Sequence, residues 1–197
     1  MPNRVVIALK VLVHIACLAP IAWLVVHLFE SNLGPDPTHT VTFFTGRGTL
    51  RLLVITLAIT PVRRLIPKLS WIIRFRRMLG LYAFFYCCLH LLTYVWLYAG
   101  FSLSAMVDDI SQRKFITAGL AAWIMMVPLA LTSTAWSIRK LGGKNWARLH
   151  WLTYLAAIAG VVHYWWGVKQ GDRTPLEITV VLCIVLAARP VLAWVRS

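Results

Sequence analysis

The chain has 197 residues, of which 60% are apolar and only 13% are charged. An ordinary soluble domain carries roughly 25% charged residues, so this composition excludes a soluble globular protein, a disordered chain and a fibrous repeat. The net charge is +14, from 20 Lys and Arg against 6 Asp and Glu. In a soluble protein this excess would suggest a nucleic-acid partner. In an apolar chain it can also reflect membrane topology, and the placement of the charges along the chain distinguishes the two explanations.

Six apolar segments approach the roughly 20 residues that a membrane-spanning helix needs. The second is the weakest, because Arg51 and Arg63 bound its uncharged part and must reach the two interfaces for it to span. The first is too long for a signal peptide and has no evident cleavage site after Phe29. Backbone groups in lipid find no water, so all six are expected to be helical. In chain order they are about 5–29, 48–66, 79–101, 115–136, 149–168 and 176–195.

The connections between these segments are too short to fold alone, because chains below about 40 residues rarely do so. We therefore expect one domain, residues 1–197. The four cysteines fall inside the apolar segments, where small core residues are expected rather than disulfide partners. They are Cys17, Cys87, Cys88 and Cys183.

The charges divide unequally when the segments alternate from a cytoplasmic N-terminus. One side receives fourteen Lys and Arg, including Arg196, and no acid, whereas the other receives six Lys and Arg and all six acids. The positive-inside rule places the first side, with both termini, in the cytoplasm. The basic loops then reflect topology and contact with anionic lipid rather than nucleic acid. The alternative is that some of them dock a partner or hold anionic cofactor groups.

Two histidines lie at matching depths in the third and fifth segments. His90 is twelve residues and His163 fourteen residues from the expected cytoplasmic end of its helix, so their depths differ by about 3 Å at 1.5 Å per residue. Ionisable residues inside a membrane are functional candidates by default. Two imidazoles at one depth can ligate a haem iron from opposite faces. The alternative for each is a local hydrogen bond.

A third histidine, His150, lies thirteen residues before His163 and about 20 Å lower by helix rise. The equivalent position on the third segment is Arg77, so a second haem there lacks a histidine ligand. Arg77 then contacts propionates or acts as an unusual ligand, or the lower site holds no haem. The other histidines are weaker candidates: His14 is ambiguous, His27 is interfacial and His39 lies in an external loop.

Several short motifs in the central part of the chain resemble one family. The stretch from Arg76 to Tyr86 leads to Leu89-His90-Leu91, and Ile59-Thr60-Pro61 is followed by Arg63-Arg64. Pro128-Leu129-Ala130-Leu131-Thr132-Ser133 and Trp146-Ala147-Arg148-Leu149-His150 follow in order. Over about residues 46–166 the chain resembles the MsrQ (YedZ) family, the haem-binding membrane subunits of bacterial periplasmic methionine sulfoxide reductases.

The resemblance implies an all-α, six-helix bundle of the ferric-reductase and NADPH-oxidase type, with b-type haem and both termini cytoplasmic. Members of the family sit in the bacterial inner membrane and pass electrons to a periplasmic molybdenum enzyme (MsrP-like), which repairs oxidised envelope proteins. The donors that it implies are the quinone pool or a cytoplasmic flavin reductase, with FMN as a further cofactor. His90, His150 and His163 match the family's haem histidines. Arg77 stands where the larger superfamily has a fourth histidine.

These observations together predict an electron-transfer subunit rather than the sulfoxide-reducing enzyme. The sequence has no glycine-rich dinucleotide loop and no P-loop, so electrons are expected to come from another protein or a lipid-soluble donor. One or two haems are expected, with propionate or flavin phosphate contacts from a set of arginines. These are Arg63, Arg64, Arg77 and Arg148. The alternatives are a transporter whose histidines relay protons and a purely structural membrane anchor.

Overall fold

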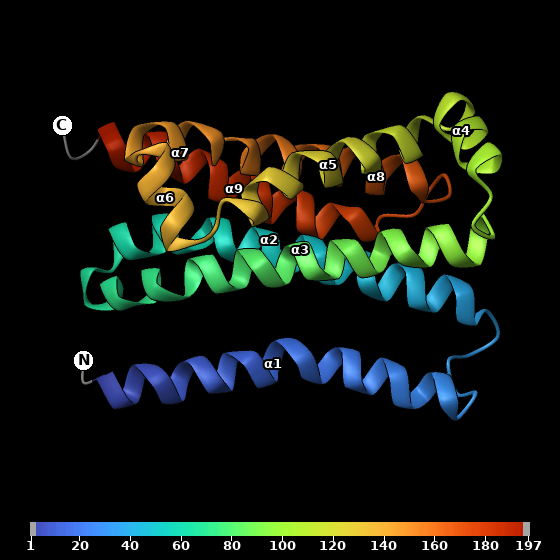
Figure 1. Ribbon diagram of the computed structural model, residues 1–197, viewed down its shortest axis with the longest axis horizontal. Coiled ribbons are helices and arrows are strands. Elements are labelled where there is room, and N and C mark those ends of the chain that lie inside the picture. Colours follow the sequence, from blue (N-terminus) through green and yellow to red (C-terminus); the bar gives the residue numbers. More distant parts are fainter. Residues whose placement is uncertain (1–2, 195–197) are drawn as a thin grey trace.

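The computed structural model describes residues 3–194, and all regular structure within that range is helical. Six long helices run along the long axis of the molecule (Figure 1). α1 begins and α9 ends at the same end of the bundle. The six are α1 (Asn3–Phe29), α2 (Pro37–Leu65), α3 (Arg76–Thr93), α5 (Lys114–Leu131), α8 (Leu152–Gly167) and α9 (Thr174–Trp194).

Short helices fill the connections. At the end where α1 begins lie α6 and α7, and α4 lies at the opposite end (Figure 1). A 3₁₀ helix precedes α3, and a π-helical turn extends it. These elements are η1 (Pro67–Phe75), η2 (Tyr94–Tyr98), α4 (Leu103–Gln112), α6 (Ala135–Leu141) and α7 (Gly143–Leu149).

Five of the described helical segments are long and apolar enough to cross a membrane: α1, α2, the run from η1 to η2, α5 and α9. This makes the chain a multi-pass membrane protein. The fifth expected span, α8, has 16 residues and runs beside the others in the bundle (Figure 1). The fourth and sixth expected segments differ from the helices at their ends. α5 stops at Leu131, because Thr132 begins a turn that leads into α6, and Val195 lies outside the described residues.

The second helix begins eleven residues before the expected start at Gly48. Asp36 caps it, since its side chain accepts a 2.9 Å hydrogen bond from the backbone N–H of His39, and Pro37 occupies the first turn. His39 is therefore in the first turn of a helix, not in a loop as predicted. Arg51 lies near the middle of α2 instead of at its outer end.

The polar side chains of this early part of α2 are threonines that bond to their own helix. The hydroxyls of Thr42, Thr45 and Thr49 donate to the carbonyls of Thr38, Val41 and Thr45 at 2.8, 2.9 and 3.1 Å. Each hydroxyl is thus satisfied without water, which lets a sequence that appears polar continue as a membrane helix.

The bundle packs around α2, which lies against α3 and α9, while α5 packs on α8. Glycine allows one of the closest approaches: a Cβ on Gly160 of α8 would come within 2.9 Å of the Leu50 side chain of α2. The first helix stands apart from this bundle (Figure 1). It is joined through hydrogen bonds from Tyr86 to the Cys17 carbonyl, 2.8 Å, and between His14 and Tyr82, 2.6 Å.

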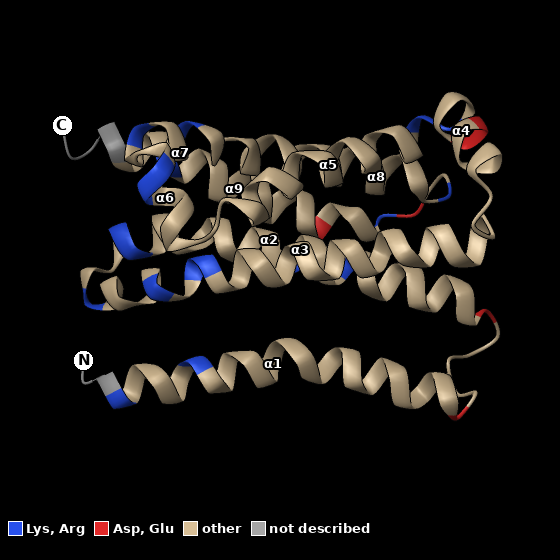
Figure 2. Ribbon diagram, viewed as in Figure 1, with Lys and Arg blue, Asp and Glu red and all other residues tan. Residues whose placement is uncertain are grey.

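The charges separate along the bundle as the sequence predicts. Lys and Arg gather at the end that carries α6, α7 and the start of α1, and Asp and Glu lie toward the opposite end (Figure 2). Arg196, which the sequence analysis counted with the basic side, lies outside the described residues. Which end faces the cytoplasm stays a prediction.

Candidate functional site

The structure brings His90 of α3 and His163 of α8 side by side. Their ring centroids are 5.8 Å apart, and the ring planes are inclined by 76°. Metal–imidazole nitrogen bonds are about 2 Å long, so two imidazoles on opposite sides of one metal have ring centres roughly 6 Å apart. The spacing of this pair therefore suits two axial ligands of one iron.

Both imidazoles are oriented by a backbone carbonyl. The Nδ1 of His90 lies 3.0 Å from the carbonyl oxygen of Thr42, and the Nδ1 of His163 lies 2.7 Å from that of Phe115. A carbonyl only accepts, so each Nδ1 donates and each Nε2 is left with a free lone pair. Metal-binding histidines show this arrangement, in which the second nitrogen donates to a carbonyl and fixes the ring.

Two glycines make room for the rings. A Cβ on Gly46 of α2 would lie 3.0 Å from Cε1 of His90, and a Cβ on Gly119 of α5 would lie 2.7 Å from Nδ1 of His163. Each imidazole is thus held between a carbonyl and a glycine on a neighbouring helix. The sequence analysis missed both glycines, because a glycine in the sequence does not show which side chain of another helix it will face.

The third predicted histidine, His150, ends α7 and precedes α8. Its ring stacks on Trp146 with centroids 3.9 Å apart, and its Nε2 lies 3.3 Å from the hydroxyl of Thr132. Burial lowers the pKa of His150, and the charge of Arg76 lowers it further. The arginine of α3 that acts on His150 is therefore Arg76, whereas Arg77 is exposed. A thirteen-residue offset matches depth only and leaves Arg77 on a different face of α3 from His90.

The remaining predicted arginines do not reach the His90–His163 pair. Arg63 and Arg64 lie half-buried in the last turn of α2, and Arg148 is exposed in the last turn of α7. α7, which His150 follows directly, lies at the end of the bundle where Lys and Arg gather (Figure 2). Any contact that these arginines make with an anionic group therefore concerns the His150 end.

Residues 45–161 match the family described as the ferric reductase like transmembrane component. The chain is 42% identical over 188 residues to "Protein-methionine-sulfoxide reductase heme-binding subunit MsrQ" of Herminiimonas arsenicoxydans, covering 94% of this chain and 86% of that protein. Identity is 42% over 197 residues with the protein of the same name from Ralstonia nicotianae, covering 98% and 90% of the two chains. With that of Xanthomonas campestris pv. campestris it is 45% over 197 residues, covering 97% and 88%.

The chain belongs to the MsrQ family. Its helical membrane architecture agrees with the ferric-reductase-like domain that the match identifies. The matched range contains His90 and His150 and ends two residues before His163. The geometry of His90 and His163 agrees with the names of these relatives, which describe them as haem-binding subunits.

One half-buried arginine of this MsrQ family member joins three helices, although the sequence analysis gave it no role. Arg189 of α9 donates from Nη2 to the carbonyl of Leu57 at 2.7 Å and from Nη1 to the hydroxyl of Tyr154. Within the described residues its Nε and the hydroxyl of Thr60 are buried without a hydrogen-bond partner. Arg189 thus ties α9 to α2 and α8, and a contact between residues 132 apart gives no local sequence signal.

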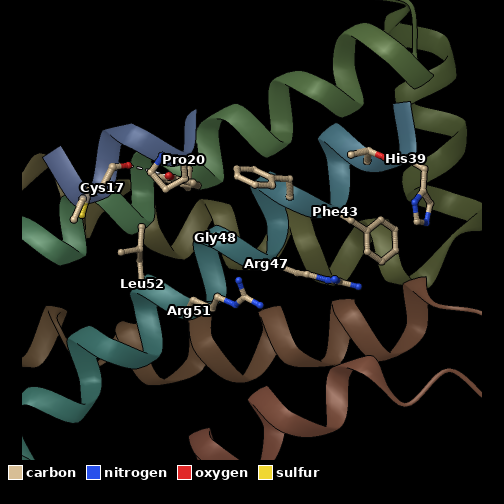
Figure 3. A pocket seen from close by; sticks show the side chains of 12 residues that line it. Cys17, Pro20, His39, Phe43, Arg47, Gly48, Arg51 and Leu52 are labelled. Atoms are coloured by element: carbon tan, nitrogen blue, oxygen red, sulfur yellow. Dashed lines mark hydrogen bonds between the residues drawn. The ribbon is translucent and has the colours of Figure 1, made fainter. Parts of the chain in front are cut away.

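A groove with a volume of 450 Å³ lies between α1, α2 and α3. Cys17 and Pro20 line it from α1, and Phe43, Arg47 and Arg51 line it from α2 (Figure 3). Arg47 also donates from Nε to the hydroxyl of Tyr164 at 2.9 Å. The sequence analysis placed Arg51 at an interface, at one end of the second segment, and named no role for Arg47.

Proposed function

We propose that this chain is a b-type cytochrome subunit that carries electrons across the bacterial inner membrane. The single observation that supports this most strongly is the His90–His163 pair, with rings 5.8 Å apart and both Nδ1 atoms bound to carbonyls. Two nitrogen ligands are what a bis-histidine haem takes from the protein. The names of the MsrQ relatives, which describe haem binding, point the same way.

The residues present fit a haem. His90 and His163 would supply the axial nitrogens, and Gly46 and Gly119 leave the rings room to take up that position. A haem held there supplies one-electron oxidation and reduction. The carbonyls of Thr42 and Phe115 hold the Nδ1 protons and so make the Nε2 atoms better donors to iron.

A second haem is proposed at the basic end. His150 would be its ligand, oriented by the stack on Trp146 and the contact with Thr132. Arginines at this end would bind propionates, or the phosphate of FMN, through charge-assisted hydrogen bonds. They are Arg63, Arg64, Arg77 and Arg148 from the sequence, with Arg76 added because its charge acts on His150.

The direction of transfer follows from the charge distribution. With α8 as the fifth of six spans and both termini cytoplasmic, the basic end faces the cytoplasm and the acidic end faces the periplasm. Quinol or a cytoplasmic flavin reductase would supply electrons. They would leave at the periplasmic end to a molybdenum-dependent methionine sulfoxide reductase (MsrP-like), in keeping with the names of the relatives.

The test is the visible spectrum of the purified, haem-supplied chain, with haem quantified as the pyridine haemochrome. We expect a Soret band and dithionite-reduced bands, and loss of most haem in His90→Ala and His163→Ala. His27→Ala is the control, because its Nδ1 contacts the Trp23 carbonyl within its own helix. A colourless protein would contradict the cytochrome proposal and favour the alternatives, a proton-relaying transporter or a structural anchor. Unchanged haem in both ligand variants would overturn the ligand assignment.

A further inference from the structure

Arg51 lines the groove between α1 and α2 near the middle of the membrane, and it also lines a second cavity together with Glu177. Arg51 is fourteen residues past Pro37 in the 29-residue α2, which is about 21 Å along the helix axis. It is exposed and has no hydrogen-bond or ion-pair partner among the residues that the structure describes. An arginine at this depth is costly unless a polar group satisfies it, so a ligand is the natural partner.

The walls of the groove suit a flat, largely apolar ring. The residues that line it include Phe43, Phe44, Leu52 and Tyr86, with Ala16 and Pro20 from α1. Figure 3 labels Phe43, Leu52 and Pro20 among them. Its volume of 450 Å³ is in the range of small-molecule sites, about 300–1,000 Å³, that combine apolar walls with a few polar groups. Arg47 and Arg51, one helical turn apart, supply the hydrogen-bond donors.

The ligand must come from the lipid phase. α1 stands apart from the bundle (Figure 1) and is held near the groove by the bond from Tyr86 to the Cys17 carbonyl. Phospholipid phosphates lie outside a hydrocarbon core about 30 Å thick, so a lipid headgroup does not reach a mid-depth guanidinium. The occupant is therefore a lipid-soluble molecule whose oxygen acceptors sit on an uncharged ring.

The groove adjoins the His90 site. Arg47 follows Gly46, which lies against the His90 ring, and Phe43 follows Thr42, whose carbonyl accepts from His90. Arg47 also bonds to Tyr164, the residue after His163. A ring bound here is separated from the histidine pair by the wall that α2 forms with α3.

We propose that this groove binds the ring of a quinone or quinol, with Arg47 and Arg51 donating to its oxygens and its tail leaving between α1 and α2. The inference rests on the proposed function for its role as a source of electrons, but the binding itself does not require haem. It places a lipid-soluble donor beside the His90–His163 pair rather than at the basic end.

The experiment measures equilibrium binding of a benzoquinone with a decyl tail to the full chain in nanodiscs of neutral phospholipid, with empty nanodiscs subtracted. A hydrogen bond from a charged donor is worth about tenfold or more in affinity, so Arg51→Gln should weaken binding by that factor. Arg74→Gln is the matched control and should bind like the wild type, because Arg74 is exposed on η1 and does not line the groove. Ala16→Phe should block quinone binding, because its ring would fill the groove from the lipid-exposed side of α1. If Arg51→Gln misfolds, Ala16→Phe still tests whether the groove binds quinone.

A photoreactive azide of the same quinone should label residues of α1 and α2 that line the groove. Binding that is unchanged in both Arg51→Gln and Ala16→Phe would overturn the proposal, as would labelling confined to other helices. The same measurement on His90→Ala separates the two ideas. If His90→Ala loses its haem but still binds quinone, the quinone site is supported independently of the haem. If the wild type binds haem but shows no quinone binding that depends on Arg51, the quinone site is wrong and the proposed function is unaffected.

Discussion

His90 and His163 come from helices that are far apart in the sequence, yet each Nδ1 is bound to a carbonyl in the first two turns of the helix beside it. Thr42 on α2 accepts from His90 at 3.0 Å, and Phe115 on α5 accepts from His163 at 2.7 Å. Four helices therefore determine the position of the two rings. The glycines that face the rings belong to the same two supporting helices.

The first prediction concerns these glycines. In Gly119→Ala the new Cβ would lie 2.7 Å from Nδ1 of His163 and displace the ring, whereas in Gly46→Ala it would lie 3.0 Å from Cε1 of His90. Loss of a residue that supports a metal ligand costs roughly 10- to 100-fold in affinity, so haem affinity should fall by this factor in Gly119→Ala and by less in Gly46→Ala. Haem titration followed at the Soret band measures it.

The control for this series is Gly80→Ala in α3. There the new Cβ would meet only the Thr56 methyl at 3.6 Å, an ordinary contact. Alanine also favours a helix over glycine by up to about 1 kcal/mol, so this variant should keep its haem and its stability. Equal haem loss in Gly80→Ala and Gly119→Ala would show that the effect is not specific to the ring.

Matching depth in two apolar segments predicted that His90 and His163 could ligate one iron, although depth alone does not show which face of its helix a residue occupies. The six helices and the separation of charge could also be predicted, because apolar length and charge placement are local properties. The start of α2 could not, since its threonines appear polar until each hydroxyl finds a carbonyl in the preceding turn. Gly119 and Arg189 were missed because what they contact is far away in the sequence.

The second prediction concerns His150. Its ring is held by the stack on Trp146 and by Thr132, at the opposite end of α8 from His163. His150→Ala should therefore lose at most the haem of the basic end and leave the haem of the His90–His163 pair in place. Pyridine-haemochrome quantitation measures the haem per chain. The prediction fails if His150→Ala removes all haem.

The third prediction concerns Arg189. Replacing it with Gln leaves the Leu57 carbonyl without its donor and Tyr154 without its guanidinium partner. A buried polar group that loses its partner costs about 1–3 kcal/mol, and the free energy of unfolding in SDS should fall by about that amount. Arg189→Lys should lose less, because an ammonium keeps the charge and one donor. Arg74→Gln is the matched control, since Arg74 is exposed, and an equal loss there would contradict the prediction.

The last prediction concerns how α1 is held. Tyr86 donates to the Cys17 carbonyl at 2.8 Å, and interhelical hydrogen bonds in membranes are worth about 0.6 kcal/mol on average. Tyr86→Phe should therefore loosen α1 without releasing it. Gly48→Ala should act more strongly, because its Cβ would lie 2.4 Å from Cδ1 of Tyr86 and force that ring out of place.

Spin labels at Leu12 on α1 and Leu81 on α3, both exposed to lipid, report the distance between the two helices by double electron–electron resonance. The distance distribution should broaden in Tyr86→Phe and broaden further in Gly48→Ala. Tyr98→Phe is the control, because Tyr98 lies at the far end of η2, away from the Tyr86–Cys17 bond. A distribution as narrow in Gly48→Ala as in the wild type would mean that other contacts fix α1, such as the stack of Trp23 on Phe44 with centroids 5.6 Å apart.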